Sequence, residues 1–312
     1  MQGLLNHRLF PVLAMSAVVV LLPLLLPSAY YYRVAALVFV FALAAVGLNL
    51  LMGFAGQVSL GHAGFMGIGA YAVAIGPAHL GLPSWLSFVG GAGLSAFVAF
   101  AVGRPILRLK GHYLAVATLG FGLLLAIAFS NEARFTGGPD GMAVPRLAVF
   151  GFSVRGAQAW YWITAASFLI GAVLALNLIE SPSGRALRAI HDSEVAARVL
   201  GVDVARMKLA VFVVSAVYAS VAGSYFALLN GHITPDVSGF LRSIELVAMV
   251  VLGGLGSVAG SLVGAALLVM LPQTLTSLHD YEHMVLGLII MLVMIFLRAG
   301  IVPTLARALR RA

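Results

Sequence analysis

The stretch SPSGRALRAIHDSEVAARVLGVDVARMK, residues 181–208, is the one long polar and basic segment of a 312-residue chain that is otherwise almost entirely apolar. We call it the basic island, because it holds five of the chain's 18 Lys and Arg residues. On each side lies an apolar run of about 20 residues, which is roughly the length an α-helix needs to cross a bilayer. The island therefore predicts a structured loop between two membrane-spanning helices.

Local capping signals in the island predict two short helices. Ser181 is a typical N-cap, and Pro182 follows it at the first helical position. Asp192 or Ser193 can cap a second helix, and Gly201 is placed to end it. These signals favour a shaped docking surface over the alternative, a solvated basic loop that only orients the chain in the membrane.

Composition places the chain among integral membrane proteins. Hydrophobic residues make up 62% of it and charged residues 9%, so a soluble globular domain is excluded. The net charge of +8 does not imply nucleic acid, because the basic residues flank apolar runs, where they orient the chain and meet anionic lipid headgroups. The chain has no cysteine, which excludes disulfide and thiol chemistry. The N-terminal apolar segment lacks a cleavage pattern, so we expect a retained first helix.

The predicted fold is an all-α, polytopic transmembrane helix bundle that forms a single domain, residues 1–312. Apolar runs bounded by charged or turn residues predict about eight full spans. Their expected bounds are Phe10 to Leu26, Val34 to Met52, Leu60 to Ile75, Trp85 to Leu107, Tyr113 to Phe129, Trp160 to Ile179, Leu209 to Leu229 and Met284 to Leu297.

The segment from Ile244 to Leu271 is too long for one span and too short for two, and Gly253, Gly254 and Gly256 interrupt it. With both termini in the cytoplasm, 13 Lys and Arg lie inside and five outside, as the positive-inside rule favours. The segment must then enter and leave on the outer side, as a glycine-hinged pair of short or re-entrant helices. Non-helical backbone at that depth is tolerated only when it is buried in protein or lines a cavity.

A second glycine-broken stretch, LLMGFAGQVSLGHAGFMGIGAYA at residues 50–72, lies in the other half of the chain. Broken segments at corresponding positions of two halves indicate a transport site, although small residues also serve close helix packing. Polar side chains in the first stretch favour a cavity, even though a lone histidine is more often a packing residue. The predicted translocation path comprises Asn49, Gln57, Ser59, His62, Glu245, Gly253, Gly254, Gly256 and Ser257.

Three stretches carry a resemblance to a known family. They are GLNLLMGFAGQVSLGHAGFMGIGAYA at 47–72, GRALRAIHDSEVAARVLGV at 184–202 and SIELVAMVVLGGLGSVAGSLVGA at 243–265. They resemble the signature regions of inner-membrane permeases of branched-chain amino acid ABC importers, the LivH/LivM family, and the LivM-type subunit in particular. The resemblance covers nearly the whole chain, in the expected order.

The resemblance implies import of aliphatic amino acids such as leucine, isoleucine and valine across the bacterial inner membrane by alternating access. It implies a second homologous permease, two cytoplasmic ATPases that bind the ATP, and a periplasmic binding protein. The basic island would dock an ATPase through the family's E-x-A-A-x-x-x-G core. The docking residues it implies are Gly184, Arg185, Arg188, Asp192, Glu194, Ala196, Ala197, Leu200 and Gly201. Permeases for urea and short amides share this architecture, but the island resembles the amino acid branch more.

The residues themselves also point to an external energy source. A P-loop needs Gly-Lys-Ser or Gly-Lys-Thr, whereas the two lysines, Lys110 and Lys208, follow Leu and Met. Catalytic and metal-ligand patterns are absent from the sequence, so the chain is not expected to be an enzyme or to bind a cofactor. The alternatives are an ion-coupled secondary transporter, for which Glu245 is the one acid near the body of a span, and a scaffolding subunit.

Overall fold

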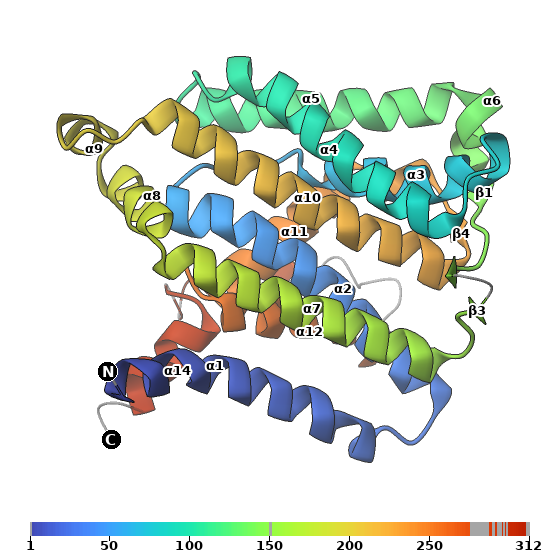
Figure 1. Ribbon diagram of the computed structural model, residues 1–312, viewed down its shortest axis with the longest axis horizontal. Coiled ribbons are helices and arrows are strands. Elements are labelled where there is room, and N and C mark those ends of the chain that lie inside the picture. The colour runs from blue at the N-terminus through green and yellow to red at the C-terminus, as the bar shows by residue number, and fades with distance from the viewer. Residues whose placement is uncertain are drawn as a thin grey trace.

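The computed structural model describes residues 2–149, 152–274, 287–288, 291, 295, 297 and 299–309. The described chain is a bundle of long helices, with short helices and strands confined to its ends (Figure 1). Five helices are long and apolar enough to cross a membrane: Ala29–Phe54, Ser84–Ile106, His112–Asn131, Ala157–Glu180 and Val204–Asn230. The predicted all-α polytopic bundle is confirmed.

Helices make up most of the described chain, with four short turns and four two-residue strands between them. The helices are α1 (Gln2–Leu21), α2 (Ala29–Asn49), α3 (His62–His79), α4 (Ser84–Ile106), α5 (His112–Asn131), α6 (Ala133–Thr136), α7 (Ala157–Glu180), α8 (Pro182–Asp192), α9 (Glu194–Val199), α10 (Val204–Asn230), α11 (Phe240–Gly253), α12 (Val258–Thr274) and α14 (Ile301–Leu309). Short turns are η1 (Leu22–Leu25), η2 (Leu50–Phe54, a π-helical turn), η3 (Gly138–Asp140) and η4 (Pro235–Ser238). Strand β1 (Met142–Ala143) pairs antiparallel with β4 (His232–Ile233), and β2 (Ala148–Val149) with β3 (Phe152–Ser153).

The helices agree with the expected spans. Each expected span between residues 10 and 229 coincides with one helix, although α1 begins and ends earlier than expected. The last expected span, Met284 to Leu297, lies mostly outside the described residues. The segment from Ile244 to Leu271 is broken where its glycines predicted, because α11 ends at Gly253 and α12 begins at Val258.

Helices α2, α3 and α10 form the centre of the bundle. Helix α2 is buried over most of its length, and α10 packs against α2, α3 and α4. Small residues allow α3 and α10 to cross closely: a Cβ added to Gly69 would lie 1.9 Å from the Ser220 carbonyl oxygen, and one added to Gly223 would lie 1.9 Å from that of Met66. Such contacts replace the hydrophobic driving force that lipid does not supply between helices.

The bundle has two ends, which we call the island end and the opposite end. The basic island joins the end of α7 to the start of α10, so α8 and α9 mark the island end (Figure 1). At the opposite end Arg33, near the start of α2, donates a hydrogen bond to Asn230, the last residue of α10, at 3.0 Å. Helix α2 therefore runs from the opposite end to the island end.

Helices α11 and α12 form a hairpin that opens toward the opposite end. The Tyr30 hydroxyl, near the start of α2, donates to Gln273 near the end of α12. The turn between the two helices lies against Asn49, at the far end of α2. This arrangement agrees with the expected hinged pair, in which both helices enter and leave on the same side.

Candidate translocation and docking sites

Asn49, the last residue of α2, joins the two glycine-broken segments. Its side chain is buried, with the residue 1% exposed, and Nδ2 donates to the Ser257 carbonyl oxygen at 2.9 Å and to Ser261 Oγ at 3.0 Å. Its Oδ1 accepts a hydrogen bond from the Gly256 N–H at 2.9 Å. One amide thus pairs the Gly256 N–H and adds bonds to the turn and to the start of α12, so it holds the non-helical turn against the end of α2.

The turn that Asn49 binds depends on glycine. Gly254 has φ +121° and Gly256 has φ +76°, backbone conformations that residues with a Cβ rarely adopt. A Cβ added to Gly53, in the π-helical turn after α2, would lie 2.3 Å from the Gly256 nitrogen. A Cβ on Gly300, just before α14, would lie 2.3 Å from the Gly254 Cα. The turn is therefore in close backbone contact with two other segments, one of which belongs to the first glycine-broken stretch.

The polar residues of the first broken stretch are buried and have hydrogen-bond partners within this chain. His62 is fully buried, and its Nε2 lies 2.6 Å from the Ser215 hydroxyl of α10. The other ring nitrogen, Nδ1, lies 3.4 Å from Ser59 Oγ. Gln57 is buried too and bonds to the carbonyl of Ala55 in its own loop. His62 therefore joins α3 to α10, Ser59 supports the His62 ring, and Gln57 stabilises its own loop.

Glu245 lies in the second turn of α11, near the opposite end, where the sequence predicted the entrance of the hinged pair. Its carboxylate forms an ion pair with Arg242 at 2.5 Å. The Arg242 guanidinium also lies over the rings of Phe41, at 5.1 Å, and Phe226, at 5.7 Å. The negative charge of Glu245 is thus balanced by Arg242 within the same helix.

The same helix leaves an apolar face uncovered. Leu241 and Ile244 are exposed on α11, and Leu255 is exposed in the turn that follows. The opposite face of α11 packs against α12, α2 and α3. The glycine-broken hairpin therefore presents apolar side chains and part of its turn to the outside of this chain.

The island folds as its capping signals predicted. Ser181 Oγ accepts from the Gly184 N–H at the start of α8, and Ser193 Oγ accepts from the Ala196 N–H at the start of α9, each at 3.3 Å. Gly201 follows α9 with φ +83°. Its left-handed conformation ends the helix, as expected for a glycine at that position.

Several expected docking residues have structural roles inside the chain. Arg188 donates to the Ile179 carbonyl at 2.9 Å and Arg185 to the Glu180 carbonyl at 3.5 Å, so both bind the last carbonyls of α7. Gly184 allows α8 to approach that same helix end, because a Cβ there would lie 2.0 Å from the Ile179 oxygen. Asp192 is exposed.

Ala197, one of the expected docking residues, is buried within its own chain. The residue is 1% exposed and packs with Ile190 and Val204 in a small core between α8, α9 and α10. The exposed apolar residues are Val195, Val199 and Leu200, with Val199 83% exposed, and Ala196 is exposed beside them. Leu200 was expected, whereas the spacing of four between the two valines was the signal that could have identified them as one helical face.

Glu194 is also turned toward its own chain. Its carboxylate forms an ion pair with Lys208 of α10, whose side chain is only 4% exposed, and a second one with Arg198 at 3.4 Å. Glu194 therefore has two basic partners within its own chain. The pair joins α9 to the first turns of α10, a helix at the centre of the bundle.

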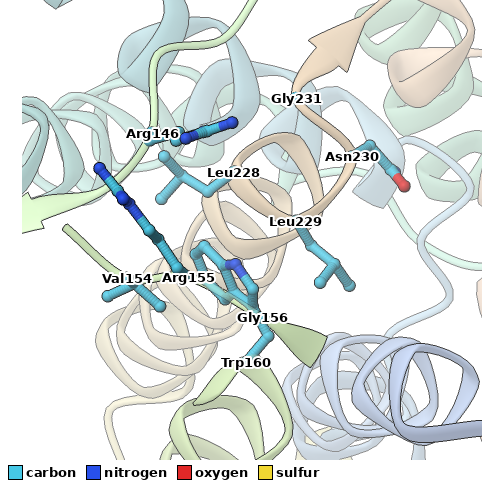
Figure 2. Close-up of a pocket in the computed structure, with 9 residues that line it drawn as sticks. All are labelled: Arg146, Val154, Arg155, Gly156, Trp160, Leu228, Leu229, Asn230 and Gly231. Carbon is cyan, nitrogen blue, oxygen red and sulfur yellow. The ribbon is translucent and has the colours of Figure 1, made fainter. Parts of the chain in front are cut away.

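A cavity of about 330 Å³ lies at the opposite end, between the start of α7 and the end of α10. It is lined by Arg146, Arg155, Trp160 and Asn230, among others. Figure 2 shows the residues around it, with Arg155 and Asn230 on opposite sides of the view. Both arginines are exposed at the surface, so the mouth of this cavity carries positive charge.

The chain was compared with known proteins. The family model described as the branched-chain amino acid transport system / permease component matches residues 30–294. The chain belongs to this permease family. It is 34% identical to the high-affinity branched-chain amino acid transport system permease protein LivM of Escherichia coli (strain K12) over 294 residues, 86% of this chain and 69% of the relative. Identity to LivH of the same organism is 27% over 286 residues, 84% of this chain and 90% of the relative.

A third relative is the permease protein BraD of Pseudomonas aeruginosa, which is 30% identical over 244 residues, 73% of this chain and 79% of the relative. The family model spans both glycine-broken segments and the basic island. The features that the sequence singled out therefore all lie within the region shared with the family.

We predict that Asn49→Ala destabilises the protein and loosens the turn. The substitution removes bonds to Gly256, Ser257 and Ser261, and an interhelical hydrogen bond in a membrane protein is worth roughly 0.6 kcal/mol or more, with an added cost for buried groups left unpaired. The free energy of unfolding in detergent should fall by about 2 kcal/mol, and amide hydrogen exchange should speed up at residues 254–257. Ser261→Ala, which removes one of these bonds, is the matched control. An equal loss of unfolding free energy in the two variants would show that Asn49 does not stabilise the turn through its bonds to Gly256 and Ser257.

We predict that Glu194→Gln is more harmful than loss of the whole ion pair. It leaves the Lys208 ammonium buried without a counter-charge, and removing one partner of a buried pair costs about 3 to 5 kcal/mol. The double variant Glu194→Gln/Lys208→Met has no such charge and should recover most of the thermal unfolding midpoint. Limited proteolysis should cut the island fastest in Glu194→Gln and more slowly in the double variant. If the double variant unfolded at the same temperature as Glu194→Gln alone, the unpaired Lys208 charge would not be the cause of the instability.

Proposed function

We propose that this chain is a permease subunit of an ATP-driven importer of branched-chain amino acids, and that it forms half of the translocation path. The observation that carries the proposal is the family match, which includes both broken segments and the island. The names of the relatives support the substrate class, since all three are branched-chain amino acid transport permease proteins. Leucine, isoleucine and valine are the substrates to test.

The path would run between this chain and a second, homologous permease. Support comes from the α11–α12 hairpin, which exposes Leu241, Ile244 and Leu255 outside the chain, whereas the buried polar residues His62 and Gln57 are already bonded within it. An aliphatic substrate side chain has its natural contact with such apolar groups. Gly253, Gly254, Gly256 and Ser257 would then bend the hairpin during alternating access.

Energy would come from two cytoplasmic ATPases that dock at the island end. The apolar tip formed by Val195, Val199 and Leu200 fits a cleft in a partner, because exposed apolar residues clustered on one helical face mark an interaction site. The Glu194–Lys208 ion pair would pass movement of α9 to α10. Nucleotide would be bound by those partners, and this chain would bind no cofactor.

A periplasmic binding protein would deliver substrate at the opposite end, where Arg146 and Arg155 are exposed. The chain would lie in the bacterial inner membrane with both termini in the cytoplasm. An ion-coupled mechanism has little support, since Glu245 is neutralised by Arg242.

We predict that Val199→Glu uncouples the permease from its ATPase without unfolding it. A charge at the centre of an apolar contact should weaken association roughly tenfold or more, as expected when a buried anchor is lost. The unfolding midpoint should not change, since Val199 is 83% exposed. The measurements are ATPase retained on affinity purification and leucine uptake into proteoliposomes of the whole complex.

The matched control for Val199→Glu is Gln158→Glu, which adds one negative charge at an exposed position of the opposite end. It should retain the ATPase. Normal retention and uptake in Val199→Glu would reject α9 as the docking surface, whereas uptake by this chain without any ATPase would reject the ATP-driven mechanism.

Orientation can be tested in a cysteine-free background, because the natural chain has none. We expect Asp140→Cys, exposed at the opposite end, to react with a membrane-impermeant maleimide added to the periplasmic side of the inner membrane. Arg198→Cys, exposed on α9, should react only after that membrane is permeabilised. The reverse pattern would invert the proposed topology.

A further inference from the structure

A second cavity, of about 430 Å³, lies at the island end. One wall comes from the loop between α4 and α5, with Arg108 and Lys110. The other wall comes from α9, the turn after it and the start of α10, with Arg198, Asp203 and Lys208. Segments almost 100 residues apart in the sequence therefore enclose one space.

The cavity carries an excess of positive charge that the chain does not neutralise. Four basic residues line it, with the acids Glu194 and Asp203. Glu194 pairs with Lys208, and the Asp203 carboxylate accepts from the Arg206 N–H at 3.0 Å as the N-cap of α10. Arg108 and Lys110 are exposed, and the ion pairs found among the described residues do not include them. Their two positive charges therefore make the cavity suited to an anion.

The position of the cavity along the helices indicates the source of that anion. Helix α4 ends at Ile106, α5 begins at His112 and α10 begins at Val204, so three membrane-crossing helices have their ends around it. That is the depth at which phospholipid headgroups lie. Leu107 and Val202 add apolar surface to the lining.

An apolar track leads away from the cavity along α5. Tyr113, one residue into that helix, is 77% exposed, and Val116 and Leu124 are exposed further along it. Tyrosine at a helix end is typical of the membrane interface, where its ring meets lipid. A phosphate held by Arg108 and Lys110 would thus have its acyl chains next to an apolar helix face.

We propose that this cavity binds the phosphate of an anionic phospholipid such as phosphatidylglycerol. Basic pockets between transmembrane helices at the cytoplasmic side are suited to such headgroups. The bound lipid bridges the α4–α5 loop to α9, beside the apolar tip formed by Val195, Val199 and Leu200. The proposal depends on the membrane location of the chain and not on its substrate or its ATPase.

The test uses the full-length chain with its copurifying subunits, reconstituted in phosphatidylcholine nanodiscs that contain graded phosphatidylglycerol. Native mass spectrometry after release into detergent counts the phosphatidylglycerol retained. In Arg108→Ala/Lys110→Ala, retention should weaken roughly tenfold or more, as expected for the loss of two basic contacts to a lipid surface. The control, Arg104→Ala/Arg206→Ala, removes two exposed basic residues of the same end that do not line the cavity, and it should retain the lipid.

The charge-conserving variant Arg108→Lys/Lys110→Arg should also retain the lipid, which separates lost charge from misfolding. Three results would overturn the proposal. If the cavity variant and its control lost equal amounts of phosphatidylglycerol, the lipid would be bound by general surface charge rather than by this cavity. Displacement of the lipid by millimolar inorganic phosphate would identify a site for a soluble anion. Loss of a copurifying cytoplasmic protein, with lipid retained, would assign the cavity to a protein partner.

Discussion

The amide of Asn49 determines how the centre of this permease can be built. A helical hairpin interrupted by glycine has backbone N–H and C=O groups that water cannot reach inside the membrane, and each unpaired group is costly. Asn49 accepts a hydrogen bond from the Gly256 N–H and donates to the Ser257 carbonyl and to the Ser261 hydroxyl. The chain can therefore hold a non-helical turn against the end of α2, and the glycines of that turn supply backbone conformations that other residues rarely adopt.

Features controlled by local physics could be predicted from the sequence. Span length follows from bilayer thickness, and the caps at Ser181 and Ser193 and the stop at Gly201 act within a few residues of themselves. The break after Gly253 was predictable for the same reason, because glycine alone tolerates the backbone conformation found there. These features depend on neighbours in the sequence, so no knowledge of distant contacts was needed.

The direction in which each functional side chain points could not be predicted in this way. His62 bonds to Ser215 and Glu194 to Lys208, which are 153 and 14 positions away. A family motif places Ala197 in a docking region, but only the packing of α8 on α10 shows that its methyl group faces inward. The sequence therefore predicted where helices break and begin, but it could not assign inward and outward faces, because faces depend on tertiary contacts.

Helix α10 connects the two ends of the molecule as one rigid rod. It runs for 27 residues from Val204, next to the ion pair with α9, to Asn230 beside the arginine-lined cavity. At 1.5 Å per residue it is about 40 Å long. A tilt of about 5° at one end of a rod of that length shifts the other by roughly 3.5 Å, about the width of a water molecule. A small tilt of α10 at one membrane surface can therefore open or close a contact at the other surface.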